Sequence, residues 1–347
     1  MALAGLVCLI GASLVRSFGT HVLHFYLSGV MHGFGIVFVG GTMAGTIIRR
    51  WFKENIGKYT GIVMSANGIG GAMAAQIVSP IINSGDVFGY RKAYLLSAVI
   101  AFVISLVVLF FLRDNPSEGP VIPGSSKKKQ PKGALWVGLE YSVVKKKAYF
   151  YIATVLVFLT GISLQSIGSI TIVYMTDLGL PTAFIATLAT VSSLTLAACK
   201  MLVGMSYDRW GLRSTLLICQ IAALYTFVIK GLLVNSTLGI VMAASATVIS
   251  GIALTLETVM IPLIANDLFG SAAYMKVLGI FMAMNSLGLC LGSPLGEAFR
   301  KITGDYRSCF WFFSIVMVIV IVAFQFVLKA ANEERNRILA ETAQQIE

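Results

Sequence analysis

The stretch Gly204-Met-Ser-Tyr-Asp208-Arg209-Trp-Gly211-Leu-Arg213 places three charged side chains and two glycines between two long apolar segments. Around it, the chain is 57% hydrophobic and 12% charged, whereas a soluble domain has about 25% charged residues. So few charges cannot cover a soluble protein of this size, so lipid must solvate much of the surface. The net charge of +11 therefore indicates basic loops beside a membrane rather than a nucleic-acid surface.

Uncharged segments long enough to cross a bilayer, which takes roughly 20 helical residues, recur along the chain. They predict an all-α membrane protein, because barrel strands would alternate over about 10 residues. The predicted spans are Met1–Val15, which is short, and 22–48, 59–84, 93–112, 148–176, 180–206, 214–234, 236–264, 277–296 and 308–328.

Ten spans would leave both termini on one side of the membrane. The loops on that side hold 18 Lys and Arg residues and the opposite loops hold seven. Because basic loops stay in the cytoplasm, the central loop and the C-terminus are predicted to be cytoplasmic, in a bacterial inner membrane. The expected organisation is an N-terminal half over 1–112, a solvated central loop over 113–147, a six-helix half over 148–328 and a tail over 329–347.

The two halves contain a similar segment. Gly61-Ile62-x-Met64-x-x-Asn67-x-x-Gly70 recurs 218 residues later as Gly279-Ile280-x-Met282-x-x-Asn285-x-x-Gly288. This indicates an internal duplication with six helices in each half. The counterparts of the spans at 148–176 and 180–206 would then lie before Met1, so we expect the last ten helices of a twelve-helix protein.

The charged stretch resembles the cytoplasmic loop signature of the major facilitator superfamily, Gly-x-x-x-Asp-[Arg/Lys]-x-Gly-x-[Arg/Lys]. In that family it lies between the second and third helices of each half. The segments Arg50–Gly61 and Gly89–Tyr94 resemble other loops of the family. The resemblance covers essentially the whole chain and implies two six-helix bundles that move a solute between them.

Physical chemistry suggests a role for this signature as a cytoplasmic gate. Asp208 can cap the following helix and pair with Arg209 or Arg213, while Gly204 and Gly211 allow close backbone approach. Such a latch would close the cytoplasmic side in one state and break in the other. The alternative is a topology anchor that stays in water.

Two ionisable residues lie inside predicted spans, where charges are costly. Lys200 is about 12 Å along the helix from Asp208, and Glu257 is about 15 Å from Asp267, at 1.5 Å per residue. Both positions are near the bilayer midplane, where such transporters bind substrate. We expect Lys200 to attract a substrate carboxylate and Glu257 to exchange a proton; alternatively, the two neutralise each other or Lys200 reaches the interface.

A cation four residues before the signature Gly204 resembles the oxalate/formate and monocarboxylate transporters, which carry Arg there. Two positions depart from them: Leu196 stands where monocarboxylate carriers have an acid, and Lys276 lies at a helix end rather than at mid-span. A small monocarboxylate is therefore favoured over a dianion.

Polar residues in apolar spans are further candidates for substrate binding: His32, Asn67, Gln165 and Asn285. Each is alternatively a helix–helix hydrogen-bond partner. The five cysteines have no CxxC spacing and are interpreted as packing residues. The sequence has no P-loop and no HExxH motif, so an ATP-driven or zinc-protease function has no support and no cofactor or metal is expected. No nucleic-acid partner is expected, because the basic residues are assigned to loops beside the membrane.

The sequence therefore predicts a secondary transporter, not an enzyme, that moves a small organic solute by alternating access. We expect a monomer in the lipid bilayer, with coupling to protons or exchange, and a carboxylate substrate. A neutral solute is the alternative substrate. A non-transporting sensor or an inactive remnant is the alternative from a different class.

Overall fold

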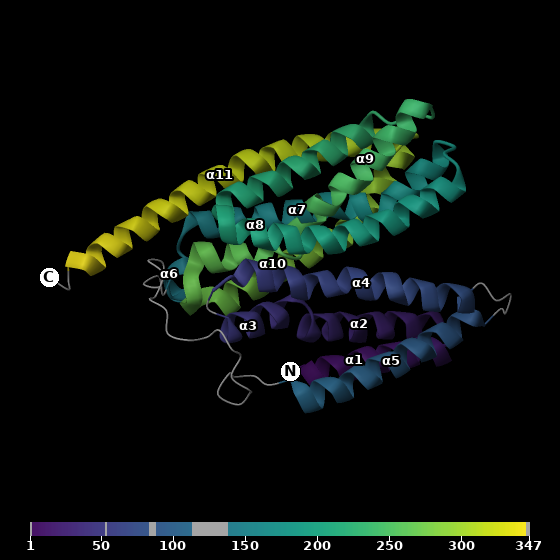
Figure 1. Cartoon of the computed structure of the whole chain (residues 1–347), viewed down its shortest axis with the longest axis horizontal. Coiled ribbons are helices and arrows are strands. Elements are labelled where there is room, and N and C mark those ends of the chain that lie inside the picture. Colours follow the sequence, from purple (N-terminus) through teal and green to yellow (C-terminus); the bar gives the residue numbers. More distant parts are fainter. Residues whose placement is uncertain (1, 53, 83–87, 113–137, 345–347) are drawn as a thin grey trace. The chain divides into compact units, whose positions relative to one another are not determined.

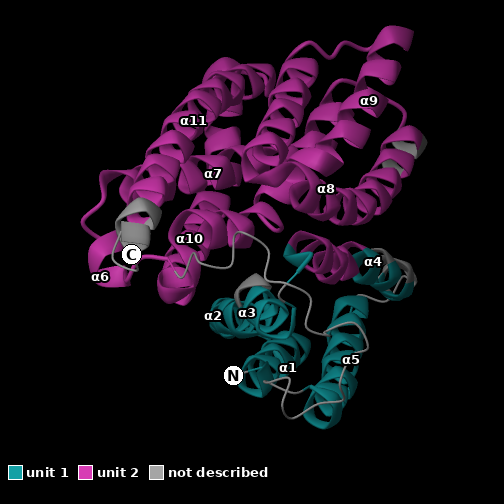
Figure 2. Cartoon of the chain, turned by 60° about the vertical axis from the view of Figure 1, so that its left-hand side comes forward, with its two compact units in different colours: residues 1–56, 69–127 teal, residues 57–68, 128–347 magenta. Residues whose placement is uncertain are grey.

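The computed structural model describes residues 2–52, 54–82, 88–112 and 138–344, and the regular secondary structure of this part of the chain consists of helices, with no strand. It contains two compact units (Figure 2), formed by residues 1–56 with 69–127 and by residues 57–68 with 128–347. Helix α4 (Ile56–Ile82) contributes to both. The all-α prediction is confirmed.

The first unit contains α1 (Ala2–Phe18), α2 (Val22–Val39), α3 (Gly41–Trp51) and α5 (Gly89–Phe111). Helix α1 packs against both α2 and α5. Arg16 donates from Nε to Ser28 Oγ at 2.9 Å, and its guanidinium lies over the Tyr94 ring. The predicted span 22–48 is divided at Gly40 into α2 and α3.

The second unit contains the first residues of α4 and six helices: α6 (Tyr141–Val144), α7 (Ala148–Asp177), α8 (Thr182–Gly231), α9 (Thr237–Ala253), α10 (Met260–Thr303) and α11 (Arg307–Gln344), with the 3₁₀ turn η2 (Leu254–Leu256) (Figure 1). Helix α10 packs on α7, α9 on α8, and α11 on both α7 and α8. Fully buried aromatic rings, including Phe227, Phe269, Phe281 and Phe313, fill the space between them.

Six helical stretches in the described residues are long and apolar enough to cross a membrane. Two of them, Thr187–Gly231 and Thr237–Thr303, each contain a glycine with a non-helical backbone. Gly211 has φ 77° and ψ 178°, and Gly270 has φ 70° and ψ −168°. Each glycine therefore separates two helical legs, and each lies between two predicted spans. Ten crossings remain a prediction.

The central loop departs from the solvated linker that the sequence suggested. Residues 113–137 lie outside the described residues, but the following segment packs on the second unit. Leu139 and Val144 are buried, and the Leu139 N–H donates to the Phe269 carbonyl oxygen at 3.2 Å, beside the Gly270 hinge. Lys147 forms an ion pair with Glu334 at 2.7 Å.

The predicted tail over 329–347 begins inside a helix. Helix α11 continues from the apolar span through Gln344, so the described part of 329–347 extends the last helix. Because Glu334 lies in this extension, the ion pair with Lys147 joins the end of the central loop to α11.

We expect Gly211→Ala to destabilise the protein by roughly 1–3 kcal/mol, because the backbone there is strained for any residue with a Cβ. The matched control is Gly279→Ala. A Cβ meets no atom within 4 Å at either glycine, but Gly279 is helical, where Ala is more favourable by up to about 1 kcal/mol. Apparent unfolding temperatures of the detergent-purified variants measure the difference. Equal effects at the two positions would contradict the strained-hinge interpretation.

Candidate transport site and gate motif

The signature residues lie where two helices approach to backbone distance. A Cβ on Gly204 of α8 would overlap the carbonyl oxygen of Gly57, and a Cβ on Gly61 would lie 3.0 Å from Met201 Cα. Further along α4, a Cβ on Gly68 would lie 3.0 Å from the Cβ of Ala197 on α8. Glycine and alanine at these positions allow α8 and the first turns of α4 to pack closely.

Asp208 caps α4 from the neighbouring helix. Its Oδ1 accepts a hydrogen bond from the Gly57 N–H at 2.9 Å, and its Oδ2 accepts one from the Lys58 N–H at 2.6 Å. These N–H groups in the first turn have no acceptor within their own helix, and the positive end of the helix dipole attracts the carboxylate.

This geometry corrects the predicted pairing of the motif. Asp208 caps α4 rather than the helix that follows it, and no ion pair with Arg209 or Arg213 occurs in the described residues. Arg213 instead donates from Nε to Gln325 Oε1 on α11 at 2.9 Å, and Arg209 lies beside the Trp210 ring. Gly211 provides the positive φ of the hinge rather than a close helix contact, since a Cβ there would meet no atom within 4 Å.

Lys200 and Glu257 are both placed inside the second unit. Lys200 on α8 is 1% exposed. Glu257 directly follows η2, and its Oε2 is buried without a hydrogen-bond partner. The two charges interact electrostatically, but no ion pair within 4.0 Å joins them in the described part of the chain. Neither charge is thus fully compensated by the other, and burial without compensation is costly.

Glu257 lies at a break in the helix. The predicted span 236–264 is continuous in sequence, but α9 ends at Ala253 and α10 begins at Met260, with η2 between them. Short 3₁₀ segments inside a helix often mark functional hinges, and interrupted membrane helices expose backbone groups that can contact a solute. The break therefore places an unpartnered carboxylate oxygen next to irregular backbone.

The other predicted binding residues are distributed between the two units. Asn285 is 4% exposed, and its Oδ1 has no partner. It lines a cavity of about 10 Å³ with Leu256, the residue before Glu257. Gln165 Nε2 donates to Ser293 Oγ at 3.4 Å, and Asn67 is exposed on α4. These three residues belong to the second unit.

His32 belongs to the first unit. Its Nδ1 is buried without a hydrogen-bond partner. The second unit therefore contains Lys200 and Glu257 together with Asn67, Gln165 and Asn285, whereas the first unit contains His32.

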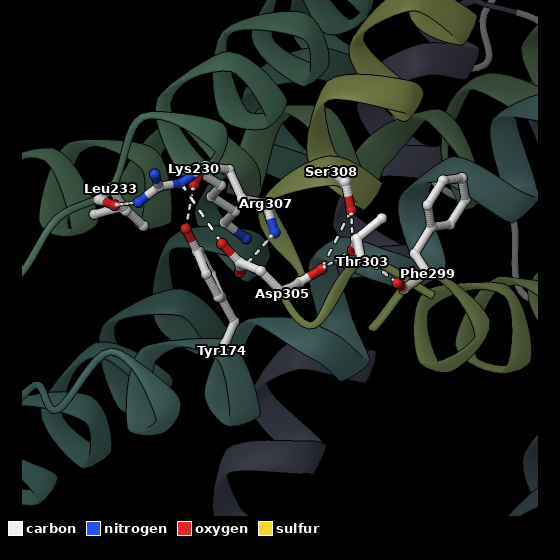
Figure 3. Close-up of polar contacts among 8 residues, drawn as sticks. All are labelled: Tyr174, Lys230, Leu233, Phe299, Thr303, Asp305, Arg307 and Ser308. Atoms are coloured by element: carbon white, nitrogen blue, oxygen red, sulfur yellow. Dashed lines mark hydrogen bonds and ion pairs between the residues drawn. The ribbon is translucent and has the colours of Figure 1, made fainter. Parts of the chain in front are cut away.

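The seven basic residues counted in the loops opposite the termini include Lys230, which the structure buries. Lys230 is 1% exposed, and its Nζ donates to Thr171 Oγ1 and, at 3.5 Å, to the Ile167 carbonyl oxygen. Tyr174 donates its hydroxyl to the Lys230 carbonyl oxygen at 3.0 Å (Figure 3). Lys230 lies within the predicted span 214–234, and this position was the signal that could have identified it as buried.

Replacing Asp208 with Asn should weaken the cap on α4, because the side chain loses its charge and one of two acceptor oxygens. We expect the amides of Gly57 and Lys58 to exchange hydrogen roughly fivefold faster, which corresponds to a cap of about 1 kcal/mol. Hydrogen–deuterium exchange of peptides spanning 54–62 measures this. The control Asp177→Asn removes an exposed carboxylate that pairs with Arg300 and should leave these amides unchanged. An unaltered rate in Asp208→Asn would refute the cap.

Comparison with known proteins agrees with this architecture. A search of curated proteins found no significant match. The Escherichia coli fucose:proton symporter FucP is structurally similar, with a TM-score of 0.67, 13% identity and coverage of 94% of this chain and 83% of that chain. The proton:xylose symporter XylE, bound to 6-bromo-6-deoxy-D-glucose, has a TM-score of 0.65, 15% identity and coverage of 94% and 78%.

The human organic anion transporter MFSD10 gives a TM-score of 0.65, 12% identity and coverage of 93% and 76%. At these identities the likeness concerns the fold. A family model described as Major Facilitator Superfamily matches residues 1–187 and 153–345. These two matches span nearly all of the sequence, and the chain belongs to the major facilitator superfamily.

Proposed function

We propose that this multi-pass membrane protein is a secondary transporter that moves a small carboxylate by alternating access. Family membership indicates a transporter rather than an enzyme. The observation that carries the substrate class is Lys200, a cation buried in α8 with no carboxylate within 4.0 Å in the described residues. A buried cation that lacks a close counter-ion is stabilised when an anion binds beside it.

Glu257 is the proposed site of proton coupling. Its Oε2 has no hydrogen-bond partner, so a proton can occupy that oxygen without displacing an existing contact. The Lys200 charge acts on this carboxylate, and an anion bound at Lys200 would compete with ionised Glu257 for that charge. Binding of the solute and of the proton would thereby favour each other, as symport requires. Asn285, Gln165, Asn67 and His32 are proposed as additional solute contacts.

The contact between Asp208 and α4 is the proposed gate latch. It joins α8 to the first turn of a different helix through two backbone hydrogen bonds, so both can be lost together when the helices separate. We place this latch on the cytoplasmic side of a cell membrane, with the central loop and the C-terminus, because the basic loops gather there. The two helical halves, 1–112 and 148–328, would rock about the solute.

A neutral sugar is the second candidate substrate. Two of the structurally similar proteins are a fucose:proton symporter and a proton:xylose symporter, whereas a third is an organic anion transporter. Sugar sites need hydrogen-bonding groups rather than a net charge, and Asn285 Oδ1 is an unpartnered acceptor of that kind. The carboxylate is preferred because a sugar would leave the Lys200 charge uncompensated.

Uptake of labelled formate, lactate and oxalate into proteoliposomes tests the substrate class, with labelled xylose and fucose in parallel. We expect uptake of a monocarboxylate, its loss by at least about 100-fold in Lys200→Ala, and its retention in Lys200→Arg, because loss of a charge-assisted contact costs about 1.5–3 kcal/mol and the vacant site adds a cost. Lys146→Ala, an exposed lysine outside the site, is the control. Carboxylate uptake that is indifferent to Lys200, or uptake of sugars alone, would overturn the assignment.

Glu257→Gln should separate proton coupling from translocation, because the amide cannot be ionised but has nearly the same shape. We expect exchange of labelled for unlabelled solute to continue, while accumulation driven by an inward proton gradient is lost. Both are measured in the same proteoliposomes. Gradient-driven accumulation at the wild-type level in Glu257→Gln would exclude this residue as the coupling group.

A further inference from the structure

A second polar site lies between α8 and α11, outside the proposed transport site. A pocket of about 290 Å³ is lined by Arg213, Gln325, Phe326, Leu328, Lys329, Asn332, Glu333 and Asn336. It thus combines two cations, three amide side chains and one carboxylate with two apolar side chains. All of these residues belong to the second unit.

The pocket contains a donor without an acceptor. Arg213 Nε donates to Gln325 Oε1 at 2.9 Å, and this bond fixes the orientation of the amide. The Gln325 Nε2 on the other side of the amide is buried without a hydrogen-bond partner. A buried donor in this state is costly, and an oxygen-rich anion in the pocket would satisfy it.

The charges in the pocket also favour an anion. Its single carboxylate, Glu333, lies 3.9 Å from Lys329 in an exposed pair, and such pairs are weak. Arg213 has no carboxylate within 4.0 Å among the described residues, and its bidentate guanidinium geometry suits phosphate oxygens.

The surface that leads to the pocket is apolar. Ile315, Ile319, Val322 and Phe326 follow one another at helical spacing on one face of α11, and each is between 50% and 69% exposed. The same spacing continues into Lys329, Glu333 and Asn336. An apolar stripe that ends in a basic, amide-rich pocket is the arrangement expected where acyl chains meet their headgroups.

We propose that this pocket binds the phosphate headgroup of an anionic phospholipid. Arg213 and Lys329 bind the phosphate oxygens, Gln325 Nε2 donates to one of them, and the acyl chains lie along the stripe from Phe326 to Ile315. Because Arg213 follows the Asp208 cap by five residues in α8, across the Gly211 hinge, a lipid held there would sit beside the proposed latch.

Native mass spectrometry of the full chain in detergent, titrated with dioleoyl phosphatidylglycerol, tests this site. We expect Lys329→Gln and Arg213→Gln each to weaken lipid binding about fivefold, the contribution of one basic side chain near an anionic lipid surface. Lys146→Gln, the same change at an exposed lysine outside the pocket, should leave binding unchanged. Gel filtration confirms that each variant is folded.

Two further ligands distinguish binding of a phospholipid from binding of acyl chains alone or of phosphate alone. Dioleoyl glycerol has the same acyl chains without a phosphate and should bind weakly to every variant. Glycerol 3-phosphate has the phosphate without acyl chains and should not displace phosphatidylglycerol at equal concentration. The proposal is overturned if both pocket variants bind lipid as the wild type does, if dioleoyl glycerol binds equally well, or if glycerol 3-phosphate displaces the lipid.

Discussion

The first N–H groups of α4 have no acceptor within their own helix, and the Asp208 carboxylate of α8 accepts two of them, from Gly57 and Lys58. This contact depends on the glycines around it, because a Cβ on Gly204 would overlap the Gly57 carbonyl oxygen. It depends also on the hinge at Gly211, which ends one leg of α8 directly after Asp208. A carboxylate, close helix packing and a reversal of the chain are thus combined within eight residues, Gly204 to Gly211.

The buried charges follow a different constraint. Lys200 of α8 and Glu257, in the helix break before α10, act on each other without forming a close ion pair. A tight pair would be difficult to open, whereas two separated charges can each accept a ligand or a proton. Lys230 provides a comparison within the same unit, since its ammonium donates to a hydroxyl and a backbone carbonyl. Its ammonium is thus satisfied by uncharged acceptors of α7, which is the pattern of a structural lysine.

The sequence predicted the fold class because apolar segments of helical length leave few alternatives in a membrane, and the motif at Gly204–Arg213 identified the superfamily. It also predicted that Lys200 and Glu257 lie inside apolar spans; Lys200 is buried, and so is the Oε2 atom of Glu257. The helix break before Glu257 was not predictable, since Leu254, Thr255 and Leu256 are compatible with a continuous span. The partners of Asp208 were also not predictable. Gly57 and Lys58 lie some 150 residues earlier and donate from backbone N–H groups, which every residue except proline has, so their side chains do not identify them. The packing of Leu139 beside Gly270 was not predictable either, because it joins segments that lie far apart in the sequence.

We propose that the contact between Asp208 and α4 opens during each transport cycle. Cysteines placed at Lys58 and Arg209, which are both exposed, can be joined by a short or a long reducible thiol cross-linker in a chain whose native cysteines are replaced. Solute counterflow in proteoliposomes is then measured before cross-linking, after it and after reduction. We expect the short linker to stop counterflow reversibly and the long linker to permit it. Unchanged counterflow with the short linker in place would show that transport does not require this contact to open.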